Sequence, residues 1–309
     1  MARVQFSVLV VAHNSARFLP ACLRSLNTQT YPADLFEVLV LDNASNDGPS
    51  EAVQQFPNVQ LHRSDKNLGF AGGNNALVPK ATGNMLVLLN PDTEADPFWL
   101  EELARCIEEN PGCAIASKLL MLDDPRRLNS TGLFLLNDGR GADRGFQQVD
   151  DGRYEAGGDV FAGCGAALAL PNTGEPIFDD KLFLYSEDLE LGWRRQKAGL
   201  RTVFCPRAVV LHAVGATEHS ATYWYYSERN RARVALRHGD VALVFTTTIG
   251  LMLRACRAVL FAIVRHPSPK YRWRNAWAVV RAAVSYLLWL PAGVVQRYAE
   301  RTTRKNPRP

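Results

Sequence analysis

The chain has 309 residues, of which 47% are hydrophobic and 21% are charged, and its formal net charge is +4. This composition is too apolar for a disordered protein, and the length suits one large domain with an appendage. The six cysteines form no CxxC pair and have no histidine at zinc spacing, which is typical of reduced, buried thiols. The N-terminal apolar run reaches His13 and Asn14 too early for a signal peptide, so we expect a cytoplasmic protein.

Four short apolar runs rich in β-branched residues predict buried parallel strands, at 6–12, 36–42, 59–63 and 85–90. A helical pattern follows each of them, at 16–28, 50–55, 69–80 and 97–109. This alternation predicts an α/β fold with a Rossmann-like, doubly wound sheet flanked by helices. Such sheets bind ligands beyond the carboxyl ends of their strands.

Polar residues stand where these strands end. Asn14 follows the first strand, the segment 42–48 follows the second, and Asn90-Pro91-Asp92-Thr93 follows the fourth. The glycine-rich segment 67–75 opens a helix whose N–H groups can meet phosphates, although a structural turn explains its glycines equally well. No G-x-G-x-x-G follows the first strand and the chain has no P-loop motif, which removes the main support for dinucleotide-binding and P-loop proteins.

The segment LYSEDLELGWRRQKAG at 184–199 places three carboxylates at the start of a basic amphipathic helix. With Ser186 as the N-cap, Glu187 and Asp188 fall in the first turn, where the helix dipole favours ionised carboxylates that act as bases. Ordinary capping by acidic residues is the alternative. We predict Asp188 as the general base with Glu187 in reserve, and expect Glu190 to orient a neighbour or form a salt bridge.

Charge is distributed unevenly along the chain. Of the 35 Lys and Arg residues, 16 lie within 229–309, against only Asp240 and Glu300 of the 31 acids. An acidic body is therefore joined to a basic tail, and the tail is too apolar for a nucleic-acid arm. An anionic membrane surface fits this tail better.

The run at 241–264 is long enough to span a bilayer, but Arg254 and Arg257 near its middle each cost about 2.5–3.5 kcal/mol there. Thr247 and the arginines fall toward one side of this helix and Leu251, Leu260 and Ile263 elsewhere, the pattern of a helix lying in the interface. Aromatic residues in the next segment suit headgroup depth, namely Trp273, Trp277, Tyr286 and Trp289. The alternative is a soluble helical hairpin that packs on the main domain or on a dimer partner.

Taken in order, VVAHNS, LDNASNDG, KNLGFAGGNN, LNPDT and YSEDLELGWRRQKAGL resemble the inverting glycosyltransferases of family 2, especially rhamnosyltransferase-like members that build bacterial surface polysaccharides. The resemblance covers about residues 5–235. It implies a GT-A fold for 1–235, a nucleotide-diphosphate sugar donor and a Mg²⁺ or Mn²⁺ ion. The helical extension 236–309 is similar to the membrane-associating ends of members that act on polyprenyl-linked saccharide acceptors at the inner face of the cell membrane.

The resemblance also implies roles for single residues. Ala12, Asn14 and Asp42 match the family's base and ribose contacts, and a second nucleotide-contacting loop is matched by Asn67, Gly69 and Asn74. Asp92 matches the last acid of the D-x-D metal motif, while Asn90 replaces its first Asp, so we expect weak metal binding without donor. His13 stands where Tyr is commoner in the family.

Three further matches are carried by the second half of the chain. His212 matches a histidine that completes the metal site in some relatives, although a lone histidine at a strand end is often a structural hydrogen bonder. Trp193 and Arg194 follow the catalytic acids and are candidates for acceptor binding, with a core tryptophan as the alternative. Arg229 and Asn230 resemble an Arg-Asn element that meets diphosphate oxygens, unless they belong to a solvated basic helix face.

Two other functions compete with this one. A nucleotidyltransferase shares the sheet topology but needs a glycine-rich, basic loop after the first strand, and AHNSARFLP has no glycine. A non-catalytic saccharide-binding protein does not require Asp42, Asp92 and Asp188 together at strand and helix ends. The sequence therefore favours the transferase.

Overall fold

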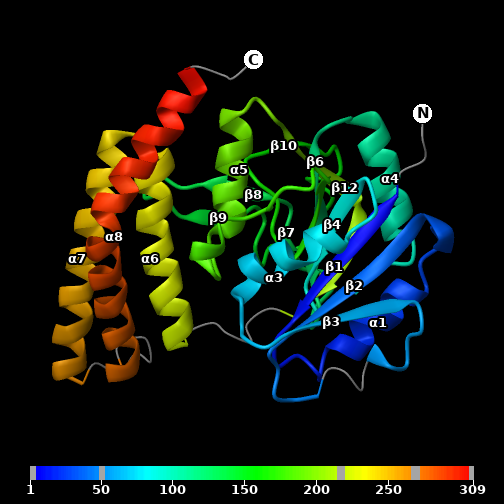
Figure 1. Cartoon of the computed structure of the whole chain (residues 1–309), viewed down its shortest axis with the longest axis horizontal. Helices are drawn as coiled ribbons and strands as arrows, with labels where there is room; N and C mark the ends of the chain where they lie inside the picture. The colour runs from blue at the N-terminus through cyan, green and yellow to red at the C-terminus, as the bar shows by residue number, and fades with distance from the viewer. Residues whose placement is uncertain (1–4, 49–52, 214–219, 266–271, 306–309) are drawn as a thin grey trace. The chain divides into compact units, whose positions relative to one another are not determined.

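A computed structural model describes residues 5–48, 53–213, 220–265 and 272–305 (Figure 1). Its contacts divide the chain into two compact units. The first unit comprises Met1–Phe134, Ala142–Phe183 and Glu187–Val214, and the second comprises Leu135–Gly141, Leu184–Ser186 and Gly215–Pro309. The domain boundary near residue 235 stays a prediction, and each unit is treated by itself below.

The first unit is built on a sheet whose N-terminal half is parallel, in the order β4-β1-β2-β3. These strands are β1 (Phe6–Ala12), β2 (Phe36–Asn43), β3 (Val59–Ser64) and β4 (Met85–Leu89). Each agrees with its predicted strand to within one residue. β1 is fully buried because helices cover both faces of the sheet, as its continuous apolar run requires.

The remaining strands make the sheet mixed. β11 (Ala167–Pro171) runs antiparallel between β4 and β6 (Ala114–Met121), while β12 (Thr202–His212) runs parallel to β6. Shorter strands extend this half, namely β5 (Thr93–Ala95), β7 (Leu128–Ser130) and β10 (Gly158–Val160), and β8 (Leu133–Leu135) pairs with β9 (Gly141–Asp143) in a separate ribbon. The mostly parallel, mixed sheet with flanking helices confirms the expected fold class.

Helices pack on both faces of this sheet. α1 (Leu19–Asn27) and α4 (Trp99–Glu109) contribute to one buried apolar cluster, and α3 (Gly69–Leu77) and α5 (Glu187–Lys197) contribute to the other. Short 3₁₀ turns connect several elements, at Ala33–Leu35, Val78–Lys80 and Asp180–Leu182. The predicted helix at 50–55 lies partly outside the described residues.

The second unit contains three helices that lie side by side, α6 (Ala221–His238), α7 (Val241–Ile263) and α8 (Trp273–Lys305) (Figure 1). Their shared core is rich in alanine, which allows close approach of the helix axes, and it also buries Leu251 and Tyr286. By length and composition alone, two of these helices are able to cross a membrane, at Val241–Ile263 and Trp273–Glu300, with mean hydropathies of 1.5 and 1.7.

The side chains of this unit correct part of the predicted pattern. Thr247 and Leu251 are both buried in the core, and the Tyr286 hydroxyl lies 2.9 Å from Thr248 Oγ1, so none of these three faces outward. Arg254 also turns inward, because its Nε donates to Glu228 Oε2 at 2.8 Å. An arginine paired in this way costs less in an apolar environment than the isolated arginine assumed from the sequence.

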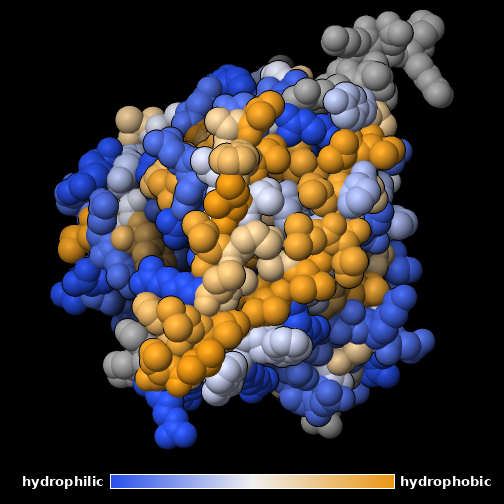
Figure 2. Space-filling view, turned by 90° about the vertical axis from the view of Figure 1, so that its left-hand side faces the viewer, coloured by the Kyte–Doolittle hydropathy of each residue, from blue (hydrophilic) through white to orange (hydrophobic). Residues whose placement is uncertain are grey.

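An apolar face nevertheless covers α7 and α8 (Figure 2). Side chains at least 40% exposed recur along both helices, including Phe245, Leu253, Leu260, Ile263, Trp273, Trp277 and Leu288. Leu260, Ile263, Trp273 and Trp277 are thus exposed, as the interfacial prediction requires, and the membrane contact itself stays a prediction. An apolar surface of this extent is typical of a protein or membrane contact.

Candidate active site

The carboxyl ends of β1 and β2 lie side by side because the two strands pair in register from Phe6 to Ala12. Asn14, whose φ is 51°, accepts a hydrogen bond through Oδ1 from the Asn46 N–H at 2.9 Å. Asp42 Oδ1 accepts one from the Ser45 N–H at 3.0 Å. The structure thus brings Ala12, Asn14 and Asp42 together, as their predicted nucleoside contacts require.

The glycine-rich loop is held by a buried asparagine that sequence reasoning did not single out. Asn43 accepts from the Leu68 N–H at 2.8 Å and donates to the Gly69 carbonyl at 3.1 Å. Asn67 Oδ1 accepts from the Gly69 N–H at 2.8 Å, and the buried Asn74 donates to the Phe70 carbonyl at 2.9 Å. These side chains shape the loop, and their contact with a nucleotide stays a prediction.

Gly69 is required by the backbone of this loop. Its φ is +72°, a left-handed conformation that other residues rarely adopt, and a Cβ there would overlap the carbonyl oxygen of Phe183. Phe183, just before α5, therefore packs closely against the start of α3 only because residue 69 is glycine.

Asp92 and His212 face each other across the pairing of β5 with β12. His212 Nε2 lies 3.5 Å from Asp92 Oδ1, and this buried oxygen accepts no hydrogen bond from any residue that the structure describes. His212 Nδ1 lies 2.7 Å from Asn129 Oδ1, an oxygen that only accepts, so Nδ1 carries a proton and Nε2 is the ring nitrogen that faces Asp92.

This arrangement fits a divalent cation. A carboxylate oxygen and an imidazole nitrogen 3.5 Å apart can both contact one ion at bond lengths of about 2.1 Å. Within the described ranges, no group of three or more His, Cys, Asp or Glu residues surrounds such a position. Two protein ligands leave most of the coordination shell to other oxygen donors. This agrees with the weak metal binding expected because Asn90 replaces the first Asp of the D-x-D motif.

The two candidate bases begin α5. Asp188 accepts hydrogen bonds from the Leu189 N–H at 2.8 Å and the Gly165 N–H at 3.3 Å. Ser186 precedes them with a φ of 67°, which is not the extended conformation of an ordinary N-cap residue, so the predicted capping geometry is wrong.

Burial rather than the helix dipole governs the protonation of this pair. Burial raises the pKa of Asp188, although the two backbone N–H groups oppose the rise by favouring its charged form. Burial and the neighbouring charge of Asp188 raise the pKa of Glu187 to about 8. Burial therefore favours the protonated form of both groups, and the two backbone N–H groups favour Asp188 as the member of the pair that ionises and accepts a proton.

A further carboxylate near this pair was missed at the sequence level. Asp143, at the end of β9, receives a hydrogen bond from Ser130 and lies close enough to Asp188 and His212 for their charges to interact. Burial, chiefly, raises the pKa of Asp143 to about 6. Its Oδ1 is buried and accepts no hydrogen bond within the described part of the chain.

Asn129 and Ser130 belong to a three-residue strand, β7, in which every side chain is buried. The only sequence signal for their role is a run of consecutive polar residues, Asn129-Ser130-Thr131, directly after a leucine. Such a run is equally typical of a loop, so the signal is weak.

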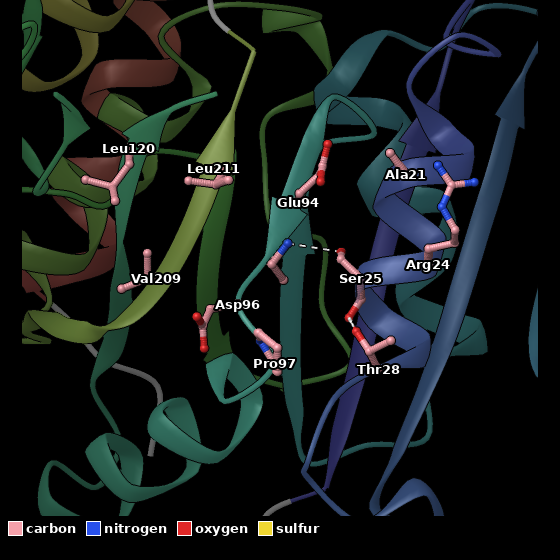
Figure 3. Close-up of a pocket in the computed structure, with 11 residues that line it drawn as sticks. Ala21, Arg24, Ser25, Thr28, Glu94, Asp96, Pro97, Leu120, Val209 and Leu211 are labelled. Atoms are coloured by element: carbon pink, nitrogen blue, oxygen red, sulfur yellow. Dashed lines mark hydrogen bonds between the residues drawn. The ribbon is translucent and has the colours of Figure 1, made fainter. Parts of the chain in front are cut away.

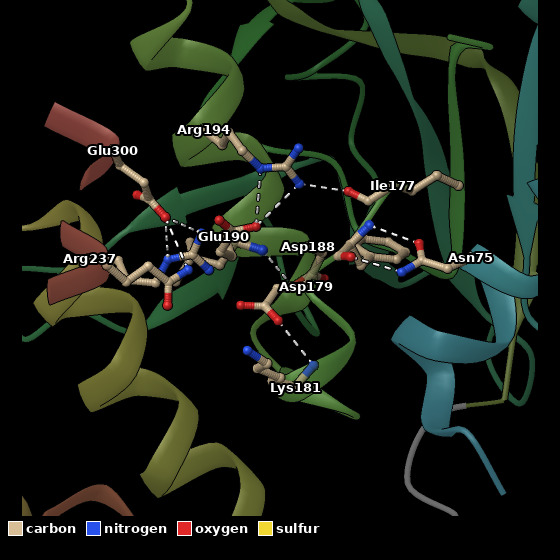
Figure 4. Close-up of polar contacts among 12 residues, drawn as sticks. Asn75, Ile177, Asp179, Lys181, Asp188, Glu190, Arg194, Arg237 and Glu300 are labelled. Carbon is tan, nitrogen blue, oxygen red and sulfur yellow. Dashed lines mark hydrogen bonds and ion pairs between the residues drawn. The ribbon is translucent and has the colours of Figure 1, made fainter. Parts of the chain in front are cut away.

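The candidate acceptor residues make internal contacts. Arg194 pairs with Glu190 Oε2 at 3.3 Å and donates to the Ile177 carbonyl at 2.6 Å (Figure 4). The expected salt bridge of Glu190 is thereby confirmed. Trp193 packs edge-on against Phe161, and Lys197 Nζ lies 6.0 Å from its ring centroid. These contacts account for both residues structurally, and their acceptor role stays a prediction.

Arg229 and Asn230 lie in the second unit. Asn230 Nδ2 donates to the carbonyls of Leu184 and Tyr185, at 2.9 and 2.7 Å, and its Oδ1 accepts from Arg229 Nε at 2.9 Å. The Arg229 guanidinium stacks over Tyr225 and Tyr226. Asn230 therefore anchors the segment just before α5, and the proposed diphosphate contacts of both residues stay a prediction.

A separate groove of about 590 Å³ lies beside α1, β5 and β12 (Figure 3). It is lined by Glu94 and Leu211, whereas Asp92 and His212 are not among its lining residues. Successive side chains of a strand point to opposite faces, so this groove lies on the other side of β12 from His212. It is not part of the candidate site.

Comparison with known proteins supports one class of enzyme. Residues 7–152 match Glycosyl transferase family 2. N-acetylglucosaminyl-diphospho-decaprenol L-rhamnosyltransferase of Mycobacterium tuberculosis is 26% identical over 296 residues, a match that spans 81% of this chain and 94% of that protein. Glycosyltransferase AglE of Haloferax volcanii is 33% identical over 99 residues, 31% of this chain and only 33% of the relative's length.

Two solved structures share the fold. GalNAc-T7 with UDP, GalNAc and Mn²⁺ superposes with a TM-score of 0.62 at 17% identity, covering 76% of this chain and 48% of that one. The mannosyltransferase PcManGT of Pyrobaculum calidifontis, in complex with GDP-Man and Mn²⁺, gives 0.56 at 18% identity, covering 93% and 88%. At this identity the likeness shows the fold alone.

The motif order, the mixed sheet, the family match and these relatives agree with one another and disfavour the nucleotidyltransferase and saccharide-binding alternatives. The chain has the GT-A fold of these solved structures, its residues 7–152 match family 2, and these findings support a glycosyltransferase.

Proposed function

We propose that this enzyme moves a sugar, such as rhamnose or another hexose or deoxyhexose, from a nucleoside-diphosphate donor to a hydroxyl of a polyprenyl-diphosphate-linked saccharide, with inversion. The observation that carries this proposal is the placement of Asp188. It is buried at the start of α5, held by two backbone N–H groups, and flanked by a glutamate that is neutral at pH 7. A single buried carboxylate held by backbone N–H groups suits one-step displacement, which needs one base.

In this reaction, the acceptor hydroxyl oxygen attacks the anomeric carbon as its proton passes to Asp188. The bond from that carbon to the diphosphate oxygen breaks, and the nucleoside diphosphate leaves with the electron pair. Ala12, Asn14 and Asp42 hold the nucleoside at the ends of β1 and β2. The loop from Asn67 to Asn74 offers backbone N–H groups to the donor.

Asp92 and His212 would hold a Mg²⁺ or Mn²⁺ ion, which neutralises charge on the diphosphate when bound. The relatives support this assignment, since two neighbours of the same fold are described with Mn²⁺ and a nucleotide or nucleotide sugar. Asn129 keeps the His212 ring in the orientation and tautomer that leave Nε2 available.

We assign the apolar face of α7 and α8 to the cytoplasmic surface of the cell membrane. The mycobacterial relative is named for a diphospho-decaprenol acceptor, a lipid that resides in a membrane. Exposed Trp273 and Trp277 and a surplus of arginine suit an anionic interface. Helices that lie in the membrane interface need Leu, Phe and Trp side chains on their outer face, and α7 and α8 expose such side chains.

The test is a screen of nucleotide sugars, first by thermal shift with Mn²⁺ and then by transfer to synthetic N-acetylglucosaminyl-diphospho-polyprenol. We expect one donor to stabilise the protein and to give an inverted glycoside in the second assay. Binding of a nucleotide sugar without transfer to any diphosphate-linked or free saccharide, and without donor hydrolysis, would refute the proposal.

Membrane association is tested by substitution rather than deletion, because α6 packs against both α7 and α8 and would lose its core if they were removed. Phe245→Ser with Leu253→Ser should weaken binding to vesicles containing phosphatidylglycerol while leaving the thermal midpoint nearly unchanged. If this double variant sediments with vesicles as well as the parent protein does, the apolar face has another partner.

A further inference from the structure

A second concave site lies within the helical unit, between α6 and α8. Its volume is about 550 Å³, in the range of small-ligand sites, which span about 300–1,000 Å³. The groove combines two arginines, Arg233 and Arg281, with Tyr225 and an apolar wall from α8. None of the described residues that line it is acidic.

The arginines of the groove rest on aromatic rings. The Arg281 guanidinium lies 5.2 Å from the Tyr225 ring centroid, and that of Arg233 lies 4.9 Å from the Trp289 centroid. Stacking on Tyr225 orients the Arg281 guanidinium so that its edge can bind an anion. Arg281 makes no ion pair or hydrogen bond with any residue in the described ranges.

Two acids of the described helices, Glu228 on α6 and Glu300 on α8, pair with other arginines. Glu228 pairs with Arg231 and Arg254, and Glu300 pairs with Arg237 (Figure 4 shows the latter). The positive charge at Arg281 is therefore not neutralised from within its own helices, and the groove is complementary to an anionic group.

The apolar wall flanks Arg281 along α8, with Trp277 one turn before it and Val284 and Leu288 after it. Trp277, Val284 and Leu288 line the groove and are 63%, 51% and 80% exposed. Their spacing of seven and four residues places them on one side of the helix. Trp277 and Leu288 of this row also belong to the apolar face of α7 and α8, so a hydrocarbon chain along it would stay in contact with that face.

We propose that the groove binds the diphosphate end and first isoprene units of a polyprenyl diphosphate, with Arg281 and Arg233 on the phosphate oxygens and Trp277, Val284 and Leu288 against the chain. A single apolar row fits one chain better than the two chains of a phospholipid, and a free nucleotide would leave the row uncovered. This inference rests on the proposed function and names the part of the protein that holds the lipid end of the acceptor.

The test compares binding of the full-length protein to two kinds of phosphatidylcholine nanodisc. One kind carries undecaprenyl diphosphate, and the other carries phosphatidylglycerol at the same total charge. We expect at least about tenfold tighter binding to the polyprenyl nanodiscs, and loss of that preference in Arg281→Ala and Leu288→Ser. The matched controls are Arg257→Ala and Leu200→Ser, which remove the same groups from exposed positions outside the groove. Both controls should keep the preference.

Equal binding of the parent protein to both kinds of nanodisc would show that a phospholipid satisfies the groove, and would overturn the proposal. Equal losses in Arg281→Ala and Arg257→Ala would do the same, because general surface charge would then explain the binding. Inorganic diphosphate that binds as tightly as the polyprenyl nanodiscs do would exclude a contribution from the apolar wall and overturn the proposal.

The readout does not depend on glycosyl transfer. If no combination of donor and acceptor gives transfer but the protein still prefers polyprenyl nanodiscs, the proposed function is refuted and the groove remains a lipid-binding site. Transfer to a soluble acceptor, with no preference among nanodiscs, would refute only the groove.

Discussion

Asn129 and His212 are 83 residues apart in the chain, and their side chains meet at 2.7 Å between Oδ1 and Nδ1. The contact joins β7 to the end of β12 and directs the other imidazole nitrogen toward Asp92. It gives His212 the geometry of a metal ligand with a fixed tautomer.

Asn129→Ala should weaken Mn²⁺ binding about 10- to 100-fold, because the His212 ring loses the partner that orients it. Electron paramagnetic resonance titration with Mn²⁺ in the presence of UDP measures this directly, without turnover. Asn172→Ala, on the opposite end of the sheet, is the control for loss of an asparagine. Unchanged Mn²⁺ affinity in Asn129→Ala would mean that the contact is only structural.

Asp92→Ala should abolish the stimulation of nucleotide binding by Mg²⁺ or Mn²⁺, since Asp92 is the carboxylate that faces His212. Calorimetry of donor-nucleotide binding with and without metal provides the measurement. Metal-stimulated affinity equal to that of the parent protein would remove Asp92 from the metal site.

Asp188→Asn should leave donor and metal binding nearly intact and lower turnover by at least about a hundredfold, the usual contribution of a positioned base. The amide keeps the size of the side chain, so the fold should survive. Steady-state kinetics and nucleotide binding on the same preparation separate the two effects. Turnover within a few-fold of the parent would transfer the role to another group.

The pH dependence of turnover should separate Asp188 from Glu187. Burial raises the pKa of Asp188, and a general base works in its ionised form. As the pH is lowered, activity should therefore be lost at a higher pH than it would be with an exposed aspartate, whose pKa is about 3.9. Glu187, with a pKa of about 8, is protonated below that pH, so Glu187→Gln should keep turnover within a few-fold at pH 7.

The ratio of Glu187→Gln turnover to that of the parent should change only above about pH 8, where the parent glutamate ionises. A pH profile of turnover for both proteins provides this comparison. A hundredfold loss in Glu187→Gln at pH 7 would instead identify Glu187 as the base.

Gly69→Ala should destabilise the protein more than Gly174→Ala. Both glycines have positive φ, +72° and +74°, so both substitutions carry the left-handed penalty of about 1–2 kcal/mol. Only at Gly69 does the new Cβ also meet the main chain and ring of Phe183, whereas nothing lies within 4 Å at Gly174. Thermal midpoints of the two variants measure the difference, and equal shifts would show that the loop relaxes without cost.

Much of the first unit follows from the sequence. The four N-terminal strands are runs of β-branched and leucine residues buried on both faces, a pattern that sterics and burial make nearly unambiguous. Parallel pairing then places Asn14, Asp42 and Asp92 at one edge of the sheet, so their proximity follows from strand order. The family motifs also located Asp188 and His212, although the functional roles of all these residues stay predictions.

Only the tertiary structure decided which charges are buried and which polar groups support the site. Glu187 and Asp188 are neighbours with similar local signals, and burial together with unequal backbone hydrogen bonding distinguishes them. Asn129 and Asp143 lie in short segments without a recognisable motif, and they join the site through contacts distant in sequence. Leu251 and Tyr286 likewise face a core that helical periodicity alone does not locate. Periodicity reports which residues share a face of an element, whereas protonation and packing depend on what the rest of the chain places against that face.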